Sequence, residues 1–183
     1  MIFTELPLKG AFLVEIKKIS DDRGFFGRAW CKNEFEEHGM NGDIKQINTS
    51  LTIKKGTIRG MHYQVDPFQE TKFIRCTRGS IYDVIIDLRP DSPTFMKWIG
   101  NELSQDNYKM IYVPGNFAHG FLSLEDNSEV YYPVTEFYTP GAERGIRWND
   151  PAFNIQWPVA ADIVSEKDAS HPDFDISTFQ KPL

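Results

Sequence analysis

Short aromatic-rich runs separated by turn residues most limit how this chain can fold. The sequence holds 14 Phe, 7 Tyr and 4 Trp in 183 residues, in runs bounded by Gly, Pro, Asn and Asp. Aromatic side chains favour strands, and the bounding residues favour turns. The expected strands are residues 11–16, 72–77, 80–88, 108–113, 119–124 and 129–137. This spacing, without long helical patterns, predicts an all-β sandwich, barrel or jelly roll.

Two short segments carry helix signals. Asn33 as N-cap and Gly39 as terminator predict one or two helical turns between them. The segment from Ser165 to Asp168 resembles a capping box at the start of a second short helix. Taken alone, this pattern makes Asp168 a structural residue rather than a catalytic one.

Length and composition indicate one ordinary folded domain that covers residues 1–183. Hydrophobic residues make up 40% and charged residues 25% of the chain, and the net charge of −6 opposes binding to nucleic acid or an anionic membrane. Charged residues interrupt residues 1–20, so we expect no signal peptide or membrane span and a cytoplasmic location. Cys31 and Cys76 are expected to be reduced thiols.

One stretch is cationic within this acidic chain. Residues 45–78 carry seven basic residues against two acidic ones. The basic residues are Lys45, Lys54, Lys55, Arg59, Lys72, Arg75 and Arg78. A phosphate-bearing ligand fits such a segment, because guanidinium and ammonium groups bind phosphate oxygens. Charges that point outward along strands give the same pattern, and composition alone favours this second interpretation.

Two of the four histidines lie in informative surroundings. The segment around His119 resembles the later metal-binding motif of the cupin jelly rolls, and His62 fits the position of the earlier motif. The His-x-His spacing of that earlier motif is absent, however, and Lys72 stands where a carboxylate ligand is expected. An ammonium group opposes a divalent cation. We therefore expect a cupin-like shell without its metal, the alternative being two hydrogen-bonded core histidines.

Ordered motifs then extend over nearly the whole chain. They are Asp22-Arg23-Gly24-Phe25-Phe26, Gln46, Asn48, Ser50, residues 56–64, Lys72, Asp83-Val84, Asp87-Leu88-Arg89, residues 92–95 and 114–121, Tyr132, residues 148–151, Trp157-Pro158 and residues 165–168. This succession resembles the dTDP-4-dehydrorhamnose 3,5-epimerase family. The resemblance implies a cupin-type antiparallel jelly roll with a few short peripheral helices, working as a homodimer to which the N-terminal strands contribute. It implies neither metal nor cofactor.

The substrate implied by the resemblance is a nucleotide-diphosphate-4-keto-6-deoxyhexose, foremost dTDP-4-dehydro-6-deoxyglucose, used in deoxysugar or surface-polysaccharide biosynthesis. A C4 ketone acidifies the hydrogens on C3 and C5, so a base can remove either one and an acid on the opposite face can return it. The resemblance assigns His62 as base, Asp168 as its partner, Lys72 to the enolate oxygen and Tyr132 as acid. From the residues alone, the alternative is that Tyr132 is an aromatic residue of the sheet, because it lies in a tyrosine-rich strand.

The resemblance also assigns a set of substrate-binding positions. These are Arg23, Phe26, Gln46, Asn48, Arg59, His119, Tyr138, Glu143 and Lys167. Arg28 stands where the family often has Glu, and Pro133 follows Tyr132 where Lys is common. The alternatives are a ketoisomerase, a single-centre epimerase on another nucleotide sugar, and a non-catalytic sugar-binding jelly roll. A binder has no need of base, acid and cation together.

Overall fold

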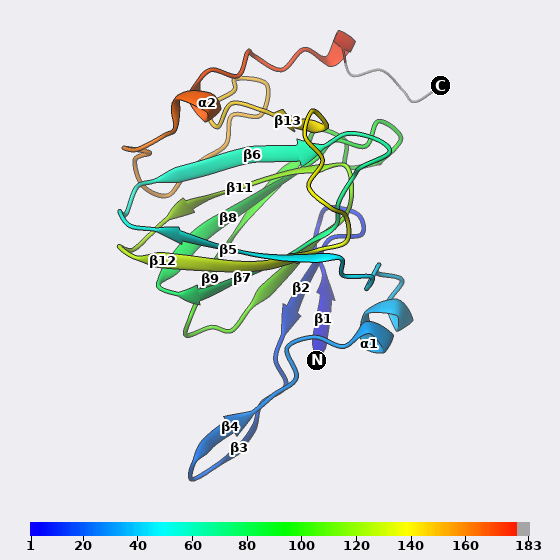
Figure 1. The fold of residues 1–183 in the computed structure, drawn as a ribbon, viewed down its shortest axis with the longest axis vertical. Helices are drawn as coiled ribbons and strands as arrows, with labels where there is room; N and C mark the ends of the chain where they lie inside the picture. The colour runs from blue at the N-terminus through cyan, green and yellow to red at the C-terminus, as the bar shows by residue number, and fades with distance from the viewer. Residues whose placement is uncertain (179–183) are drawn as a thin grey trace.

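Two antiparallel sheets pack face to face in the computed structural model, which describes residues 1–178 (Figure 1). The first sheet, in spatial order, contains β1 (Ile2–Glu5), β2 (Phe12–Glu15), β10 (Met110–Val113), β7 (Lys72–Arg78), β12 (Ser128–Val134) and β5 (Gln46–Thr52). The second contains β13 (Glu143–Gly145), β6 (Ile58–Gln64), β11 (Phe117–Ser123), β8 (Ser80–Asp87) and β9 (Trp98–Ser104). The all-β prediction is confirmed.

The order of the strands is that of a jelly roll. Strands β5, β6, β7 and β8 alternate between the two sheets, and β9, β10, β11 and β12 return along the same path in reverse. Each returning strand lies beside an outgoing one, as in two interlocked Greek keys. Strand β5 therefore pairs with β12, and β6 pairs with β11. This arrangement brings residues near 60 together with residues near 120.

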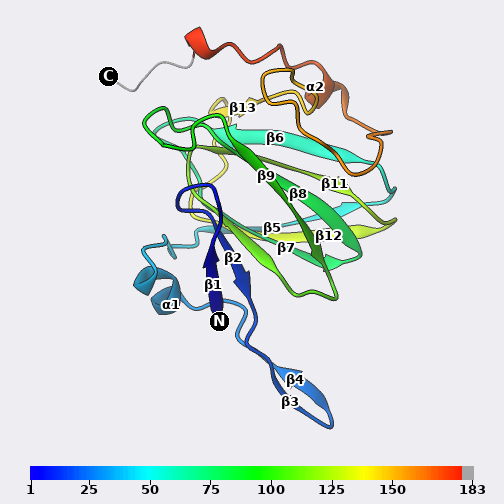
Figure 2. The same cartoon turned by 180° about the vertical axis from the view of Figure 1, so that it is seen from behind.

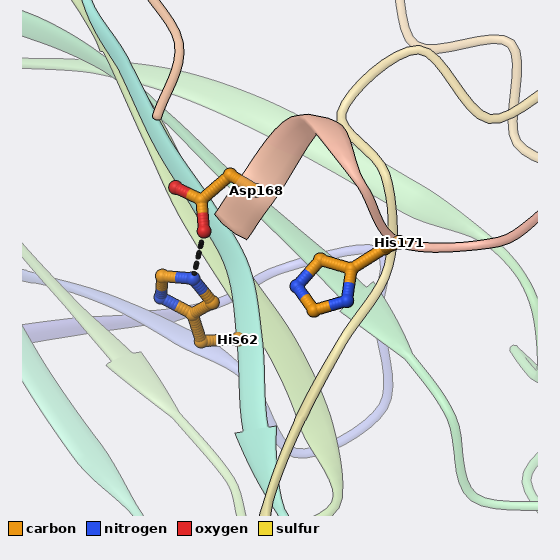
Figure 3. Close-up of side chains that lie close together, drawn as sticks. All are labelled: His62, Asp168 and His171. Atoms are coloured by element: carbon orange, nitrogen blue, oxygen red, sulfur yellow. Dashed lines mark hydrogen bonds and ion pairs between the residues drawn. The ribbon is translucent and has the colours of Figure 1, made fainter. Parts of the chain in front are cut away.

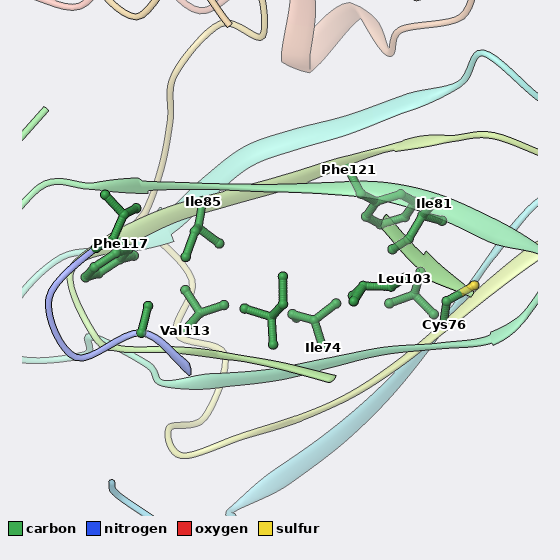
Figure 4. Close-up of a cluster of buried hydrophobic side chains, with 12 residues drawn as sticks. Ile74, Cys76, Ile81, Ile85, Leu103, Val113, Phe117 and Phe121 are labelled. Atoms are coloured by element: carbon green, nitrogen blue, oxygen red, sulfur yellow. The ribbon is translucent and has the colours of Figure 1, made fainter. Parts of the chain in front are cut away.

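The core lies between the sheets because alternate residues of each strand point inward. Twelve buried side chains fill this space, and Figure 4 shows Ile74, Ile81 and Ile85 among them. Each fully buried side chain of this size contributes about 1.5–3 kcal/mol. A second cluster, which includes Met61, covers the outer face of the second sheet with residues between Ile146 and Ile155. Strand β8 is consequently buried on both faces.

The helices are short and peripheral. Helix α1 (Lys32–Glu37) ends before Gly39, whose φ of +74° suits a terminator, as predicted. The predicted N-cap was wrong: the cap is Cys31, which makes no side-chain bond, and Asn33 lies inside the helix. Helix α2 (Glu166–Ala169) is capped by the Ser165 side chain, in agreement with the capping pattern. A short 3₁₀ turn, Ile176–Thr178, follows.

All six predicted strands are present, with small changes at their ends. Strand β10 begins at Met110 rather than Tyr108, whose φ of +55° is incompatible with a strand. Several strands were not predicted, including β5, β6 and β9. Strand β5 alternates small polar residues with apolar ones, and β6 is interrupted by Gly60, so neither has the aromatic-rich pattern.

One hairpin stands away from the sandwich. Strands β3 (Ile19–Asp21) and β4 (Gly24–Phe26) pair only with each other and project beyond the body in both views (Figures 1 and 2). Their large apolar side chains are exposed, Ile19 by 67% and Phe26 by 71%. Within residues 1–178, no helix is both long and apolar enough to cross a membrane.

Candidate active site

A histidine and a buried aspartate form the centre of the candidate site (Figure 3). Asp168 Oδ1 lies 2.7 Å from His62 Nε2, and Asp168 Oδ2 accepts the Gly60 N–H at 3.2 Å. The Asp168 backbone N–H is bound by Ser165 Oγ at 3.1 Å. The single turn of α2 thus holds a carboxylate against β6. Asp168 has both roles considered from the sequence: its backbone belongs to the cap and its side chain to the site.

The Asp168 carboxyl is ionised at neutral pH. Burial opposes the charged form, but the hydrogen bond from His62, the attraction to its ring and the Gly60 N–H outweigh burial, so the pKa of Asp168 is lowered. A buried carboxylate of this kind fixes the orientation of its histidine and stabilises the imidazolium form. The bond uses Nε2, which leaves Nδ1 of His62 for chemistry.

An irregularity in β6 sets which side chains face the sandwich interior. His119 of β11 pairs with His62, but Phe121, two residues further, pairs with Arg59, three residues away. This extra residue is a β-bulge. Without the bulge, residues three apart on a strand point to opposite faces. With it, Arg59 and His62 are both directed into the gap between the sheets, where Arg59 Nε donates to Thr52 Oγ1 of β5 at 3.0 Å.

A second histidine–aspartate pair lies beside the first. His119 Nε2 is 2.7 Å from Asp83 Oδ2 on β8. Asp83 is fully buried, and its other oxygen has no hydrogen-bond partner among residues 1–178. Asp83 was not among the predicted site residues, although it stands in one of the ordered motifs. Its burial on the central strand β8 could not be read from the sequence.

Lys72 and Tyr132 approach from the facing sheet. Lys72 is 7% exposed; its ammonium pairs with Glu70 at 3.1 Å and lies 3.4 Å from the backbone oxygen of His62. Tyr132 packs against the core cluster. Burial, and then the charge of Glu70, raise the pKa of the Tyr132 hydroxyl, while Arg59 opposes them. The hydroxyl is therefore protonated at neutral pH and able to donate. Glu70 was not predicted.

The predicted cationic segment divides into two groups. Lys45 and Lys54 make surface ion pairs with Glu136 and Asp126, as expected if these charges point outward from the strands. Lys72 and Arg59 instead turn into the gap between the sheets. Composition alone favoured outward-pointing side chains for all the basic residues of this segment. The structure shows this arrangement for only part of the segment.

Other predicted binding residues surround this gap. Gln46 Nε2 donates to Asn48 Oδ1 at 2.8 Å, and the backbone N–H of Tyr138 donates to Gln46 Oε1 at 3.3 Å. Glu143 of β13 forms an ion pair with Lys167 of α2. Strand β13 pairs with β6 beside His62, so this ion pair flanks the histidine.

Arg23 and Phe26 are predicted site residues that the fold of this chain does not bring to His62. Both lie on the β3–β4 hairpin, at the end of the molecule opposite α2 (Figures 1 and 2). The Arg23 side chain is 90% exposed and pairs with Asp21 at 2.6 Å. Arg28, the departure from the family pattern, forms an ion pair with Glu34 at 2.6 Å.

His171 is a further histidine near the pair, and no sequence pattern indicated its position. It follows α2, and Figure 3 shows its ring directed toward His62 and Asp168. Burial, and then the charge of His62, lower the pKa of His171, so its ring is neutral at neutral pH.

The chain is similar to a known protein family and to named members of it. The family model described as dTDP-4-dehydrorhamnose 3,5-epimerase matches residues 5–175. Proteins of that name from Sinorhizobium fredii and Shigella flexneri are 40% and 41% identical, covering 94% and 95% of this chain and 89% and 95% of their own.

The chain is also similar to proteins of known structure. The Bacillus anthracis enzyme of that name, with TDP and PPi bound, has a TM-score of 0.90 at 42% identity and covers 94% of this chain and 99% of its own. The Legionella pneumophila enzyme, in complex with dTDP-4-keto-L-rhamnose, has a TM-score of 0.85 at 33% identity, covering 92% and 90%.

The two roles of Asp168 predict different pH dependence in two variants. Asp168→Asn keeps the backbone cap and removes the charge, and we expect it to lower the free energy of unfolding at pH 7 by about 1–3 kcal/mol. Because the folded pKa lies below the unfolded value of 3.8, the stabilisation is complete above pH 3.8 and disappears as pH falls through the folded pKa. Urea unfolding between pH 7 and pH 3 measures it.

Ser165→Ala is the matched control. It removes the cap, at a cost of about 0.5–2 kcal/mol, and leaves the carboxylate in place. Its deficit should stay nearly constant over the same pH range. A deficit of Asp168→Asn that is equally constant down to pH 3 would show that the charge of Asp168 does not contribute to stability.

Proposed function

The chain belongs to the dTDP-4-dehydrorhamnose 3,5-epimerase family, and we propose that it inverts C3 and C5 of dTDP-4-dehydro-6-deoxyglucose. It is an epimerase of deoxysugar biosynthesis. The observation that carries the specific proposal is the convergence of a paired histidine, a buried ammonium group and a protonated tyrosine in the gap between two sheets. Relatives of known structure bind TDP and dTDP-4-keto-L-rhamnose.

Proton removal is the proposed role of His62. Nδ1 is the ring nitrogen not bonded to Asp168, so it takes the proton from C3 or C5 and the ring becomes an imidazolium. The carboxylate of Asp168, ionised because its pKa is lowered, stabilises that cation through the 2.7 Å bond to Nε2.

The electrons of the broken C–H bond move to the C4 oxygen and form an enolate. Lys72 is proposed to stabilise this negative charge, because an ammonium group held in a largely buried position acts strongly on a developing oxyanion. Tyr132, on the facing sheet, returns a proton from the opposite side of the sugar ring and thereby inverts the carbon. Protons are exchanged without a net change of oxidation state, so the proposal includes no cofactor and no catalytic metal.

The remaining predicted residues are proposed to bind the nucleotide. Arg59 and His119 face the gap next to His62, and a guanidinium group binds two diphosphate oxygens at once. Asp83 keeps His119 oriented through its 2.7 Å bond. Gln46, Asn48, Tyr138 and the pair Glu143–Lys167 line the approach to these groups.

We further propose that two copies of the chain complete each site. Arg23 and Phe26 are predicted binding residues, yet they project from the body on the exposed hairpin. A projecting hairpin with exposed apolar side chains is unfavourable in water, and a second protomer can cover it. In a symmetric homodimer each hairpin then reaches the site of the other protomer.

A single-centre epimerase is the second candidate. It is supported by a 3′-monoepimerase from Streptomyces bikiniensis, solved in complex with dTDP-quinovose, with a TM-score of 0.83 at 30% identity. The same base and acid serve either reaction, and only the pose of the sugar selects the carbon.

Solvent-deuterium incorporation tests the function. With dTDP-4-dehydro-6-deoxyglucose in D₂O, we expect deuterium at both C3 and C5, measured by NMR. Removing a catalytic base costs ~10²–10⁴-fold in rate, so His62→Ala should lose exchange at both carbons while still binding dTDP. Deuterium at C3 alone would establish the single-centre reaction. No exchange in the parent enzyme would rule out the epimerase proposal.

Tyr132→Phe separates the acid from a sheet aromatic, because it removes only the hydroxyl. If Tyr132 returns the proton, His62 still exchanges substrate hydrogen with solvent and little inverted product forms. The ratio of deuterium incorporation to product inversion should therefore rise on the order of tenfold or more. A ratio equal to that of the parent enzyme would exclude Tyr132 as the acid.

Mixed dimers test the shared site. The single variant His62→Ala and the double variant Arg23→Ala/Phe26→Ala should each have little activity when expressed alone. A mixed dimer has one site with both defects and one with neither, so random association of co-expressed chains should restore about a quarter of the parent activity. If each site used only its own chain, the mixed dimers would be as inactive as their parents.

A further inference from the structure

His62, Asp168 and His171 form a group with the spacing of a metal site. Each offers one ligand atom, and the three atoms lie within 4.8 Å of one another. Figure 3 shows the three side chains converging from β6, α2 and the segment that follows α2. His62 stands at the position of the earlier cupin motif, but Asp168 and His171 lie outside both cupin motifs, and His171 is not used in the proposed mechanism.

The position of His171 is specific and leaves a ligand atom available. Its Nε2 is buried and makes no hydrogen bond to any group within residues 1–178. Gly145 permits this position, because a Cβ there would lie 2.0 Å from the same nitrogen. Gly145 is the cross-strand neighbour of His62, so the backbone of β13 holds the two histidines on one side of the sheet.

The donor set selects a class of metal. Two imidazole nitrogens and one carboxylate oxygen suit Zn²⁺ and similar divalent transition ions, with ligand distances of about 2.0–2.2 Å and one open position. The Gly60 N–H already holds the second oxygen of Asp168, which is the outer-shell support that such sites require. The His62 side chain is 31% exposed, so an ion can reach the group from solvent.

Lys72 does not prevent binding. Its ammonium group is paired with Glu70 at 3.1 Å and is directed to the backbone oxygen of His62, not to the ring. The positive charge that argued against a metal from the sequence is thus balanced by a carboxylate that the sequence did not connect with the site.

We propose that His62, Asp168 and His171 form a binding site for Zn²⁺ that inhibits the enzyme reversibly. The ion binds His62 Nε2, and the proton of that nitrogen moves through solvent to Nδ1, so that the ring stays neutral. The ion also takes the carboxylate that would otherwise stabilise the imidazolium. Nδ1, now protonated, can no longer accept a proton from the substrate. Binding of the ion is independent of the proposed function, whereas inhibition rests on it.

Calorimetric titration with ZnCl₂ tests binding on the untagged, chelator-treated full-length protein. We expect one ion per chain, with affinity lowered on the order of tenfold or more in His171→Gln, because one of three ligands is lost. His38→Gln is the matched control: His38 is exposed, and its Nδ1 contacts the backbone oxygen of Glu34, so this variant should bind like the parent protein. Equal affinity in all three proteins, or no binding to the parent, would overturn the proposal.

Inhibition is measured separately on the same proteins. Activity of the parent should fall with Zn²⁺ and return with EDTA, and His171→Gln should keep its basal activity and need about tenfold more Zn²⁺. If His171→Gln unfolds, Co²⁺ added to the parent should give the visible absorption of a four-coordinate nitrogen and oxygen site, and its absence would overturn the proposal. Binding without any epimerisation would reject the proposed function and retain the site.

Discussion

The close approach of two glycines on β6 and β11 determines the geometry of the interior. A Cβ on Gly60 would lie 2.6 Å from Gly120 Cα, and a Cβ on Gly120 would lie 2.7 Å from the backbone oxygen of Arg59. Gly60 also has a φ of +116°, which other residues avoid. This contact accommodates the bulge, and the bulge directs Arg59 and His62 to the same side. A substituent at either position would separate the two strands that carry both histidine pairs.

The site also depends on how buried charges are paired. Asp168, Asp83 and Lys72 are each less than a tenth exposed, and an isolated charge at such a position is strongly unfavourable. Each has a partner of opposite or variable charge within 3.1 Å: His62, His119 and Glu70. The pairs allow three ionisable groups to lie beside a hydrophobic core, and removing one partner leaves the other charge uncompensated. The same pairing keeps the histidines in fixed orientations.

The fold divides the sandwich into an apolar part and a polar part. Ile74, Ile81 and Leu103 fill the region between the central strands. The polar side chains around His62 come from several strands: Arg59 from β6, Lys72 from β7, Asp83 from β8 and His119 from β11. Helix α2, more than a hundred residues further along the chain, closes over β6 and brings Asp168 and His171 to His62. The base, its partner and the proposed inhibitory site thus share one small region.

Much of this was available in the sequence, because it depends on local patterns. Aromatic runs between turn residues predicted six of the strands, Ser165 predicted the cap of α2, and the ordered motifs assigned His62, Asp168, Lys72 and Tyr132 to the site. The tertiary structure alone decided what depends on contacts between distant residues. It paired Asp83 with His119 and Glu70 with Lys72, turned Arg59 inward through a bulge, and placed His171 beside His62. It also carried Arg23 and Phe26 away from His62. Periodicity describes the face of a regular strand, and it contains no information about an extra residue or about which distant strand becomes a neighbour.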